Sequence, residues 1–346
     1  MSDCLQNCKI TPYYRNLLDS LGPDHPLRRT VEILDDYTPM PGELADPLGE
    51  EAHSPVSGLV HTYPDKVLLF ATLDCAVYCR YCTRSRLVGK THPRLAPLAN
   101  PSAGGDFRNS PPAEGCPQGR GGLISDDGFR YLEMHNEIRD VLVSGGDPLT
   151  LSDTELDELL FKVRSIRHIR TIRIGSKVPA VWPQRITPEL AAILAKHRVW
   201  LQLHFIHPAE LTAEMTRACD TLAEAGVPMV SQTVLLKGIN DDTDTLAELF
   251  YGLLERRVKP YYLFQCDPVI GSSSFRTPVE KGLQLIRELQ GRISGLAMPT
   301  FAIDAPGGGG KISLLPNSQF RREGNEIVLT NYEGKEYRYP DDQILS

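Results

Sequence analysis

The sequence predicts an α/β protein built as a partial (β/α)6 barrel with a helical N-terminal extension and a short C-terminal β-hairpin. From Leu68 onward, short β-branched runs alternate with amphipathic helical stretches, which is typical of a parallel sheet made from βα units. The chain has 346 residues and is 41% hydrophobic, so it can bury a large core. The candidate strands are Val67–Leu73, Asp140–Ser144, Thr171–Gly175, Trp200–Phe205, Met229–Leu236 and Tyr261–Cys266.

Three regions follow from composition. Residues 1–62 are predicted to form a helical, proline-rich extension that caps the barrel. The barrel should span residues 63–311, interrupted at 90–126 by a loop of 37 residues. This loop contains 6 prolines and 6 glycines and has too few apolar residues to fold on its own. Residues 312–346 are predicted to be a tail with a hairpin, since residues 326–339 are β-branched and aromatic around a Glu-Gly turn.

Helix starts can be placed between the strands. Ser152–Glu155 and Thr277–Glu280 both match the capping box, in which a hydroxyl and a carboxylate satisfy free backbone N–H groups. Thr187 precedes Pro188, which favours proline at the first helical position. We therefore expect helices to begin at all three places.

Three cysteines follow the first candidate strand. Cys75, Cys79 and Cys82 have the spacing C-x3-C-x2-C, with no fourth cysteine nearby. This pattern suits a [4Fe-4S] cluster that keeps one iron open for an outside ligand, whereas structural zinc takes four protein ligands. A zinc site that borrows His92 as its fourth ligand is the alternative.

Other polar groups also follow candidate strands. In barrels of parallel strands, chemistry is carried by loops at the carboxyl ends of the strands. The groups found there are Ser144-Gly-Gly-Asp147, His204, Gln232 and Asp267. We expect them to share one face with the cysteines.

A second motif lies near the C-terminus, where Lys311 follows four glycines in Asp304-Ala-Pro-Gly-Gly-Gly-Gly-Lys311. It is not a Walker phosphate loop, because the first glycine of that motif would fall at Ala305 and its Ser/Thr at Ile312. A lysine presented here could form a Schiff base with pyridoxal phosphate, which needs a desolvated amine of lowered pKa. A surface loop ending in a solvated lysine is the alternative.

Charge and hydropathy narrow the partners. With 37 basic and 44 acidic residues the net charge is −7, which disfavours nucleic acid and anionic membranes. No run approaches 18 apolar residues, and the first residues lack the pattern of a signal peptide. We therefore expect a cytoplasmic protein whose partners are small molecules or other proteins.

The cysteine loop with Thr83-Arg84, the turn Ser144–Pro148 and the glycine-lysine motif occur here in an order that resembles the lysine 2,3-aminomutase family. The resemblance covers roughly residues 11 to 340. It implies a partial barrel of the radical S-adenosylmethionine type and an isomerase that interconverts L-lysine and L-β-lysine. In that family, a 5′-deoxyadenosyl radical acts on an aldimine of pyridoxal phosphate, so the implied cofactors are a [4Fe-4S] cluster, S-adenosylmethionine and pyridoxal 5′-phosphate.

The resemblance also implies residue roles. Cys75, Cys79 and Cys82 would bind the cluster, while Gly145, Gly146 and Asp147 would receive the amino group of S-adenosylmethionine. Lys311 would carry pyridoxal phosphate, and Lys66, His204 and Gln232 would line the cofactor pocket. Arg84 would clamp the substrate carboxylate, and Asp267 and Asp304 would hold the distal amine of lysine. Two carboxylates facing one pocket favour a basic side chain and disfavour glutamate.

The chain departs from the family in several places. Lys66 stands where the family has an arginine near the cofactor phosphate, and Phe264 where it has a tyrosine. No cysteine follows Cys266, and Asp242 replaces a cysteine of the interfacial zinc site in clostridial-type members. The sequence therefore leaves both zinc binding and a homo-oligomer open.

Several of these residues also have an interpretation without a role in catalysis or binding. Arg84 could be a solvated arginine, Asp267 and Asp304 could be turn residues, and His204 could be a core histidine. Arginine or another amino acid could be the substrate, and the product could serve modification of elongation factor P. The protein could also be an iron–sulfur electron carrier, but Lys311 would then have no role. If it is the enzyme, it needs an electron donor such as flavodoxin or ferredoxin.

Overall fold

A nine-stranded sheet forms the body of the protein, and its strand order β1 to β9 follows the chain. The computed structural model describes residues 9–32, 40–89, 124–315, 320–324, 326–331 and 333–340. The strands are β1 (Leu59–Tyr63), β2 (Lys66–Thr72), β3 (Asp140–Gly145), β4 (Thr171–Ser176), β5 (Val199–His204), β6 (Met229–Leu235), β7 (Val258–Gln265), β8 (Thr300–Ala305) and β9 (Gly310–Ser313). Strands β2 to β8 are parallel, and β1 and β9 pair antiparallel at the two edges.

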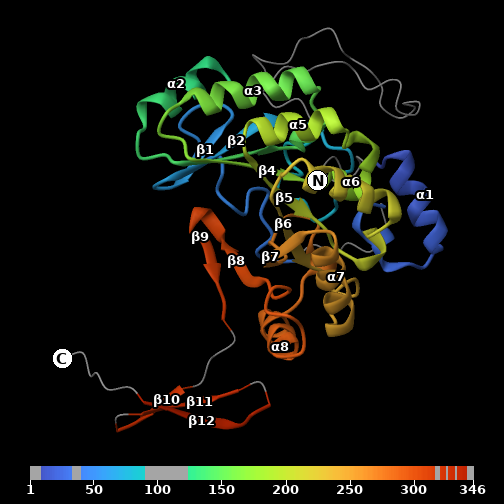
Figure 1. Cartoon of the computed structure of the whole chain (residues 1–346), viewed down its shortest axis with the longest axis vertical. Coiled ribbons are helices and arrows are strands. Elements are labelled where there is room, and N and C mark those ends of the chain that lie inside the picture. Colours follow the sequence, from blue (N-terminus) through green and yellow to red (C-terminus); the bar gives the residue numbers. More distant parts are fainter. Residues whose placement is uncertain are drawn as a thin grey trace.

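Helices connect the successive parallel strands and follow one another around the sheet (Figure 1). They are α2 (Asp126–Met134), α3 (Asp153–Ser165), α4 (Val178–Val181), α5 (Pro188–Lys196), α6 (Ala213–Glu224), α7 (Thr243–Glu255) and α8 (Val279–Leu289). The six crossovers confirm the predicted partial (β/α)6 barrel, and all six candidate strands are present. Among the described helices, none has both the length and the apolar character needed to cross a membrane.

Side chains of the parallel strands point alternately outward to the helices and inward to a cavity. On β6, Thr233 and Leu235 are buried, whereas Gln232 and Val234 line the cavity. This alternation follows from the two-residue period of a strand. A sheet covered by helices on its outer face therefore keeps its inner face available for a site.

Two of the three predicted helix starts are confirmed. Ser152 and Glu155 form the capping box of α3, and Thr187 caps α5 with Pro188 in the first turn. The third prediction holds only in part, because α8 begins near the predicted place, at Val279, but the predicted capping box is absent. The Thr277 carbonyl and hydroxyl oxygens instead accept hydrogen bonds from Gln265 Nε2, so this hydroxyl is used by tertiary structure.

The N-terminal extension contains α1 (Pro12–Leu21) and the 3-10 helix η2 (Pro26–Thr30). Tyr14 of α1 is fully buried, and its hydroxyl donates to Glu210 Oε1 at 2.9 Å. The sheet begins earlier than the predicted boundary, since residues 59–62 already belong to β1. Most of the predicted loop at 90–126 lies outside the described residues, which resume at 124.

A separate three-stranded antiparallel sheet follows the barrel and is drawn apart from it in Figure 1. Its strands are β10 (Phe320–Glu323), β11 (Glu326–Thr330) and β12 (Glu336–Pro340). Strands β11 and β12 form the predicted hairpin, and β10 extends it by one strand. The predicted end of the barrel at residue 311 falls inside β9, which continues to Ser313.

Candidate active site

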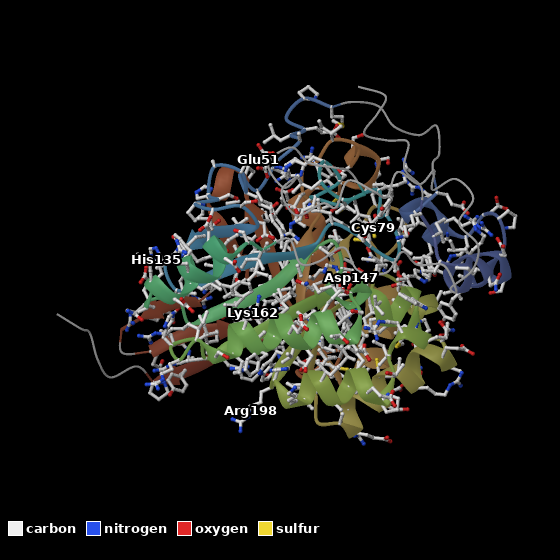
Figure 2. All side chains as sticks on the ribbon, turned by 90° about the horizontal axis from the view of Figure 1, so that it is seen from above. Glu51, Cys79, His135, Asp147, Lys162 and Arg198 are labelled. Atoms are coloured by element: carbon white, nitrogen blue, oxygen red, sulfur yellow. The ribbon has the colours of Figure 1, made fainter. Side chains whose placement is uncertain are left out.

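A cavity of about 790 Å³ lies inside the barrel, and every site residue predicted from the sequence lines it. These residues are Lys66, Cys75, Cys79, Cys82, Arg84, Gly145, Gly146, Asp147, His204, Gln232, Asp267, Asp304 and Lys311. Figure 2 shows Cys79 and Asp147 toward the middle of the molecule, and Arg198 at its edge. The motifs from opposite ends of the chain therefore line the same cavity.

The cysteine loop follows β2 and is held by the N-terminal extension. The backbone N–H of Tyr78 donates to the Lys9 carbonyl (3.0 Å), and that of Arg80 donates to the Thr30 carbonyl (2.9 Å). Burial raises the thiol pKa of all three cysteines, that of Cys82 to about 11. Thiolates are thus costly here unless a cation is bound beside them.

The two metal sites predicted for these thiols differ in their ligands. In the part of the chain that the structure describes, no three His, Cys, Asp or Glu side chains converge as ligands of one metal ion. In a four-iron cluster each thiolate binds a different iron, so the sulfurs stand farther apart than ligands of a single ion. His92, the fourth ligand of the alternative zinc site, lies outside the described residues.

The Gly145-Gly146-Asp147 turn packs directly on the end of β2. A Cβ on Gly145 would lie 2.2 Å from the Thr72 carbonyl oxygen, and Gly145 has a φ of +121°, so glycine is required. The Asp147 carboxylate is buried and accepts hydrogen bonds from Leu149 N, Ser176 Oγ and Lys177 N. Asp147 thus ties β3 to β4 beside the cysteine loop, and its role toward S-adenosylmethionine stays a prediction.

His204 and Gln232 meet on neighbouring strands. Gln232 Nε2 donates to His204 Nε2 at 2.9 Å. Burial, together with the positive charges of Lys177 and Arg84, lowers the pKa of His204 to about 4, so the imidazole is neutral near pH 7. Lys66 lies at the amino end of β2, whereas the cysteine loop follows the carboxyl end of the same strand. Both line the cavity, so the cavity extends along the length of the barrel.

Lys311 and Asp304 face each other across the antiparallel strands β8 and β9. Their pairing explains the seven-residue spacing in sequence, since the glycines form the turn between the two strands. Lys311 Nζ donates to Asp304 Oδ1 at 2.7 Å and lies 4.1 Å from the centroid of the Phe264 ring. The Lys311 backbone N–H donates to the Tyr63 hydroxyl at 2.6 Å, which connects the two edge strands.

Asp267 lies in the loop after β7 and also lines the cavity. Burial, together with the negative charge of Asp304, raises the pKa of Asp267 to about 7, although Lys311 and Arg84 act in the opposite direction. The pair Asp267 and Asp304 therefore makes this end of the cavity favourable for a cation.

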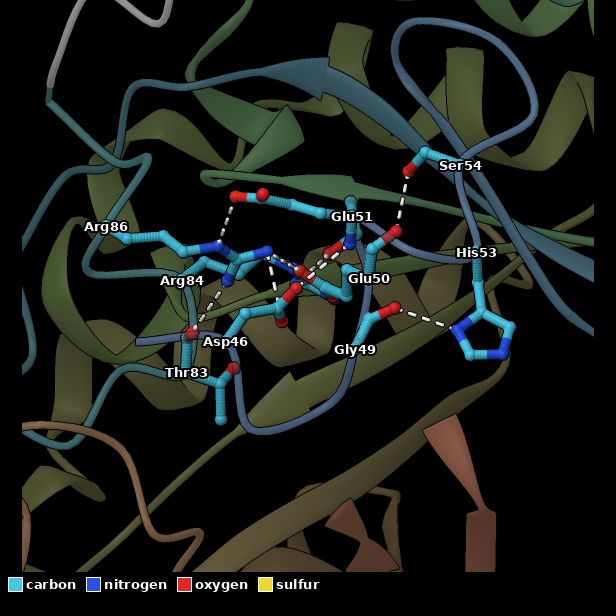
Figure 3. A network of polar contacts seen from close by, with 10 residues as sticks. Asp46, Gly49, Glu50, Glu51, His53, Ser54, Thr83, Arg84 and Arg86 are labelled. Atoms are coloured by element: carbon cyan, nitrogen blue, oxygen red, sulfur yellow. Dashed lines mark hydrogen bonds and ion pairs between the residues drawn. The ribbon is translucent and has the colours of Figure 1, made fainter. Parts of the chain in front are cut away.

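Arg84 is not the solvated arginine of the alternative interpretation, because its side chain is 16% exposed and paired with Glu50. Arg84 Nε donates to Glu50 Oε1 at 2.8 Å, and Nη1 donates to Ser144 Oγ at 3.2 Å. Figure 3 shows the side chains of Arg84 and Arg86 directed toward Glu50. Burial lowers the pKa of Arg84, but the charge and hydrogen bond of Glu50 outweigh this effect and raise it.

Glu50 belongs to a segment, residues 44–53, that we call the strap. The strap pairs with the residues after Asp267, through Leu44 N to the Pro268 carbonyl (2.8 Å), and with the glycine turn, through Gly307 N to the Pro47 carbonyl (2.9 Å). A Cβ on Gly308 would lie 2.2 Å from His53 Cε1, so glycine there lets the strap lie against the turn.

Sequence reasoning missed three residues that line this cavity, namely Glu50, Tyr63 and Lys177. The acidic run Glu50-Glu51 opposite the basic Arg84 and Arg86 was a usable signal for the first. Lys177 forms a 2.6 Å ion pair with the fully buried Glu210, and no local pattern indicated it.

Comparisons with known proteins agree with this geometry. A family model described as Lysine-2,3-aminomutase matches residues 286–345. An L-lysine 2,3-aminomutase of Clostridium subterminale is 43% identical over 338 residues, covering 96% of this chain and 75% of that protein. A glutamate 2,3-aminomutase of Clostridioides difficile is 36% identical over 342 residues, covering 97% of this chain and 74% of that protein.

A solved radical SAM methyltransferase from Sphaerobacter thermophilus has a TM-score of 0.44 and 16% identity, covering 71% of this chain and 68% of its own, and is too distant to bear on function. The sequence relatives are far closer and extend over almost the whole chain. The chain therefore belongs to the lysine 2,3-aminomutase family of isomerases.

Proposed function

We propose that this protein is an L-lysine 2,3-aminomutase, which interconverts L-lysine and L-β-lysine. The observation that carries the proposal is that one cavity is lined both by three cysteines from one motif and by Lys311, Asp267 and Asp304 from the C-terminal part of the barrel. A radical mechanism on a covalently held substrate needs both sets of groups around one space. The relatives named L-lysine 2,3-aminomutase support the same assignment.

The residues present fit the implied cofactors. Cys75, Cys79 and Cys82 are soft donors whose buried thiolates need positive charge, as a [4Fe-4S] cluster provides. Lys311 presents a primary amine inside the cavity, as covalent attachment of pyridoxal phosphate requires. When bound, the cluster and S-adenosylmethionine supply a carbon-centred radical that removes a substrate hydrogen, and pyridoxal phosphate spreads the unpaired electron.

The protein's own side chains would accept a proton from Lys311 and bind the charged groups of the substrate. Asp304 Oδ1, 2.7 Å from Lys311 Nζ, is the atom placed to take the proton that this amine must lose before it can act as a nucleophile. Arg84 would bind the substrate carboxylate through its terminal N–H groups. The neutral His204 can accept a hydrogen bond without adding charge to the cavity.

Substrate choice follows from the charges of the cavity. Asp267 and Asp304 would hold the distal ammonium of lysine between them, whereas the second carboxylate of glutamate would be repelled. One of the relatives is named glutamate 2,3-aminomutase, so this distinction matters within the family. Arginine also carries a distal cation and remains the alternative substrate.

The proposal includes a reducing setting. We propose that the protein works in the cytoplasm and receives single electrons from a donor such as flavodoxin or ferredoxin, because an exposed iron is readily oxidised. The decisive experiment is anaerobic incubation with S-adenosylmethionine, pyridoxal phosphate, a reductant and each common amino acid, followed by product identification. L-β-lysine formed from L-lysine supports the proposal, whereas β-arginine or β-glutamate as the main product contradicts it.

The two aspartates provide a mutational prediction. Asp267→Asn and Asp304→Asn should each lower kcat/KM for L-lysine by about 30- to 4000-fold, since losing one partner of a desolvated charge pair costs about 2–5 kcal/mol. Asp220→Asn, at an exposed position on α6, is the matched control and should leave the kinetics unchanged. Wild-type rates in both cavity variants would mean that these carboxylates do not recognise the side chain.

A pH dependence follows from Asp267. Its pKa of about 7 means that the carboxylate is protonated below pH 7 and attracts the lysine ammonium fully only above it. We expect kcat/KM to fall as the pH drops through about 7, and this inflection to disappear in Asp267→Asn. Because the pKa in the folded protein exceeds the ordinary aspartate value of 3.8, the native state binds more protons, so this group's stabilising contribution is lost as the pH rises through about 7.

A further inference from the structure

Glu50 is a buried carboxylate that the proposed chemistry does not use. Its side chain is 6% exposed, and it comes from the strap rather than from the barrel. Its Oε1 accepts from Arg84 Nε at 2.8 Å and lies 2.7 Å from Arg84 Nη2, and its Oε2 lies 3.1 Å from Arg86 Nη2. Figure 3 shows these contacts converging on one side chain.

The hydrogen bonds of Arg84 determine which of its donors remain for a ligand. A guanidinium carries five N–H groups in a rigid plane. Glu50 occupies the Nε side, Ser144 takes one N–H of Nη1, and the Phe70 ring centroid lies 5.5 Å from the guanidinium carbon. Counted over the contacts of the described residues, one N–H remains on each terminal nitrogen, and two such N–H groups can bind a carboxylate through two hydrogen bonds.

The charge of Arg84 is also compensated within the protein. Glu50 neutralises the charge of Arg84, so the attraction between Arg84 and a ligand carboxylate is weakened. The binding energy of that carboxylate then depends more on its alignment with the two remaining N–H donors. Arg86 is shared among Glu50, Asp46 and Glu51, so it does not replace Arg84 at the cavity. The orientation of Arg84 thus depends on Glu50.

We propose that Glu50 is a positioning residue that turns the terminal edge of Arg84 toward the cavity and thereby makes the enzyme select substrates with a free α-carboxylate. This inference rests on the proposed lysine aminomutase function. It concerns the strap, which also contacts the residues after Asp267 and the glycine turn before Lys311. One segment therefore arranges both ends of the substrate site.

The test compares two ligands that differ only at the carboxyl group, L-lysine and L-lysinamide. Their affinities would be measured by calorimetry on anaerobic protein loaded with pyridoxal phosphate and its cluster, without reductant, so that no turnover occurs. Glu50→Ala should weaken the binding of L-lysine by about 10- to 100-fold, the size of effect seen when a residue that orients a binding group is lost. The affinity for L-lysinamide should stay unchanged. Glu51→Ala, which removes only a half-exposed partner of Arg86, is the matched control.

Two further variants separate positioning from folding. Glu50→Gln has the same shape without the charge, so it should lower the melting temperature less than Glu50→Ala does while losing part of the preference for L-lysine. In the Arg84→Ala background, Glu50→Ala should add little, because both act on the same contact. Equal weakening of both ligands by Glu50→Ala, or additive losses in the double variant, would overturn the inference.

The wild-type protein distinguishes this inference from the function on which it rests. If wild type binds L-lysine with no preference over L-lysinamide, the role of Glu50 is refuted while the aminomutase proposal stands. If wild type binds neither ligand, the proposed function fails and the inference fails with it.

Discussion

Replacing Cys79 with alanine should abolish the iron–sulfur cluster. Three thiolates on one loop are the minimum set for a four-iron cluster with an open iron, so two cannot hold it. Anaerobically purified wild type should contain about four irons per chain, and the Cys79→Ala protein close to none, by iron analysis and visible absorbance. Activity should disappear together with the iron.

A buried cysteine elsewhere provides the control for this prediction. Cys219 lies on α6 in the core, with its sulfur 3.5 Å from that of Met215, so Cys219→Ala should retain the full iron content. A normal cluster in Cys79→Ala would refute the assignment of the loop. Stoichiometric zinc in anaerobic wild type would favour the zinc site instead.

Replacing Lys311 with alanine should remove covalent attachment of pyridoxal phosphate while leaving the iron content intact. Lys311 lies at the opposite end of the chain from the cysteines, although both line the same cavity. Borohydride reduction followed by peptide mapping should place the pyridoxyl label on Lys311 in wild type. Aminomutase activity should be lost, because the substrate must be held by the same cofactor.

Other lysines in the cavity could carry the pyridoxyl label instead. Lys66 and Lys177 also line it, so a label on either of them would show that our cofactor assignment is wrong. Lys237 lies outside the cavity lining and offers a control, because Lys237→Ala should be labelled as in wild type. Iron loss in Lys311→Ala would indicate a general defect of folding.

Much of the barrel could be predicted from the sequence because its signals are local. The six candidate strands were found from short β-branched runs, and the capping box at Ser152 from four residues. Such patterns reflect backbone preferences and burial within one element. The same local reasoning failed at Thr277, whose hydroxyl is bonded to Gln265 from a neighbouring strand, and it did not identify β1, β8 or β9.

The sequence by itself determined which chemical groups this protein carries: the three cysteines, the glycine-lysine motif and the two aspartates. Only the tertiary structure decided how these groups meet. Lys311 shares a cavity with the three cysteines because strands β1 to β9 assemble into one sheet, and Glu50 reaches Arg84 because the strap lies against the loop after β7 and the glycine turn. The physical reason is that contacts between distant segments depend on assembly of the whole sheet, which no window of neighbouring residues encodes.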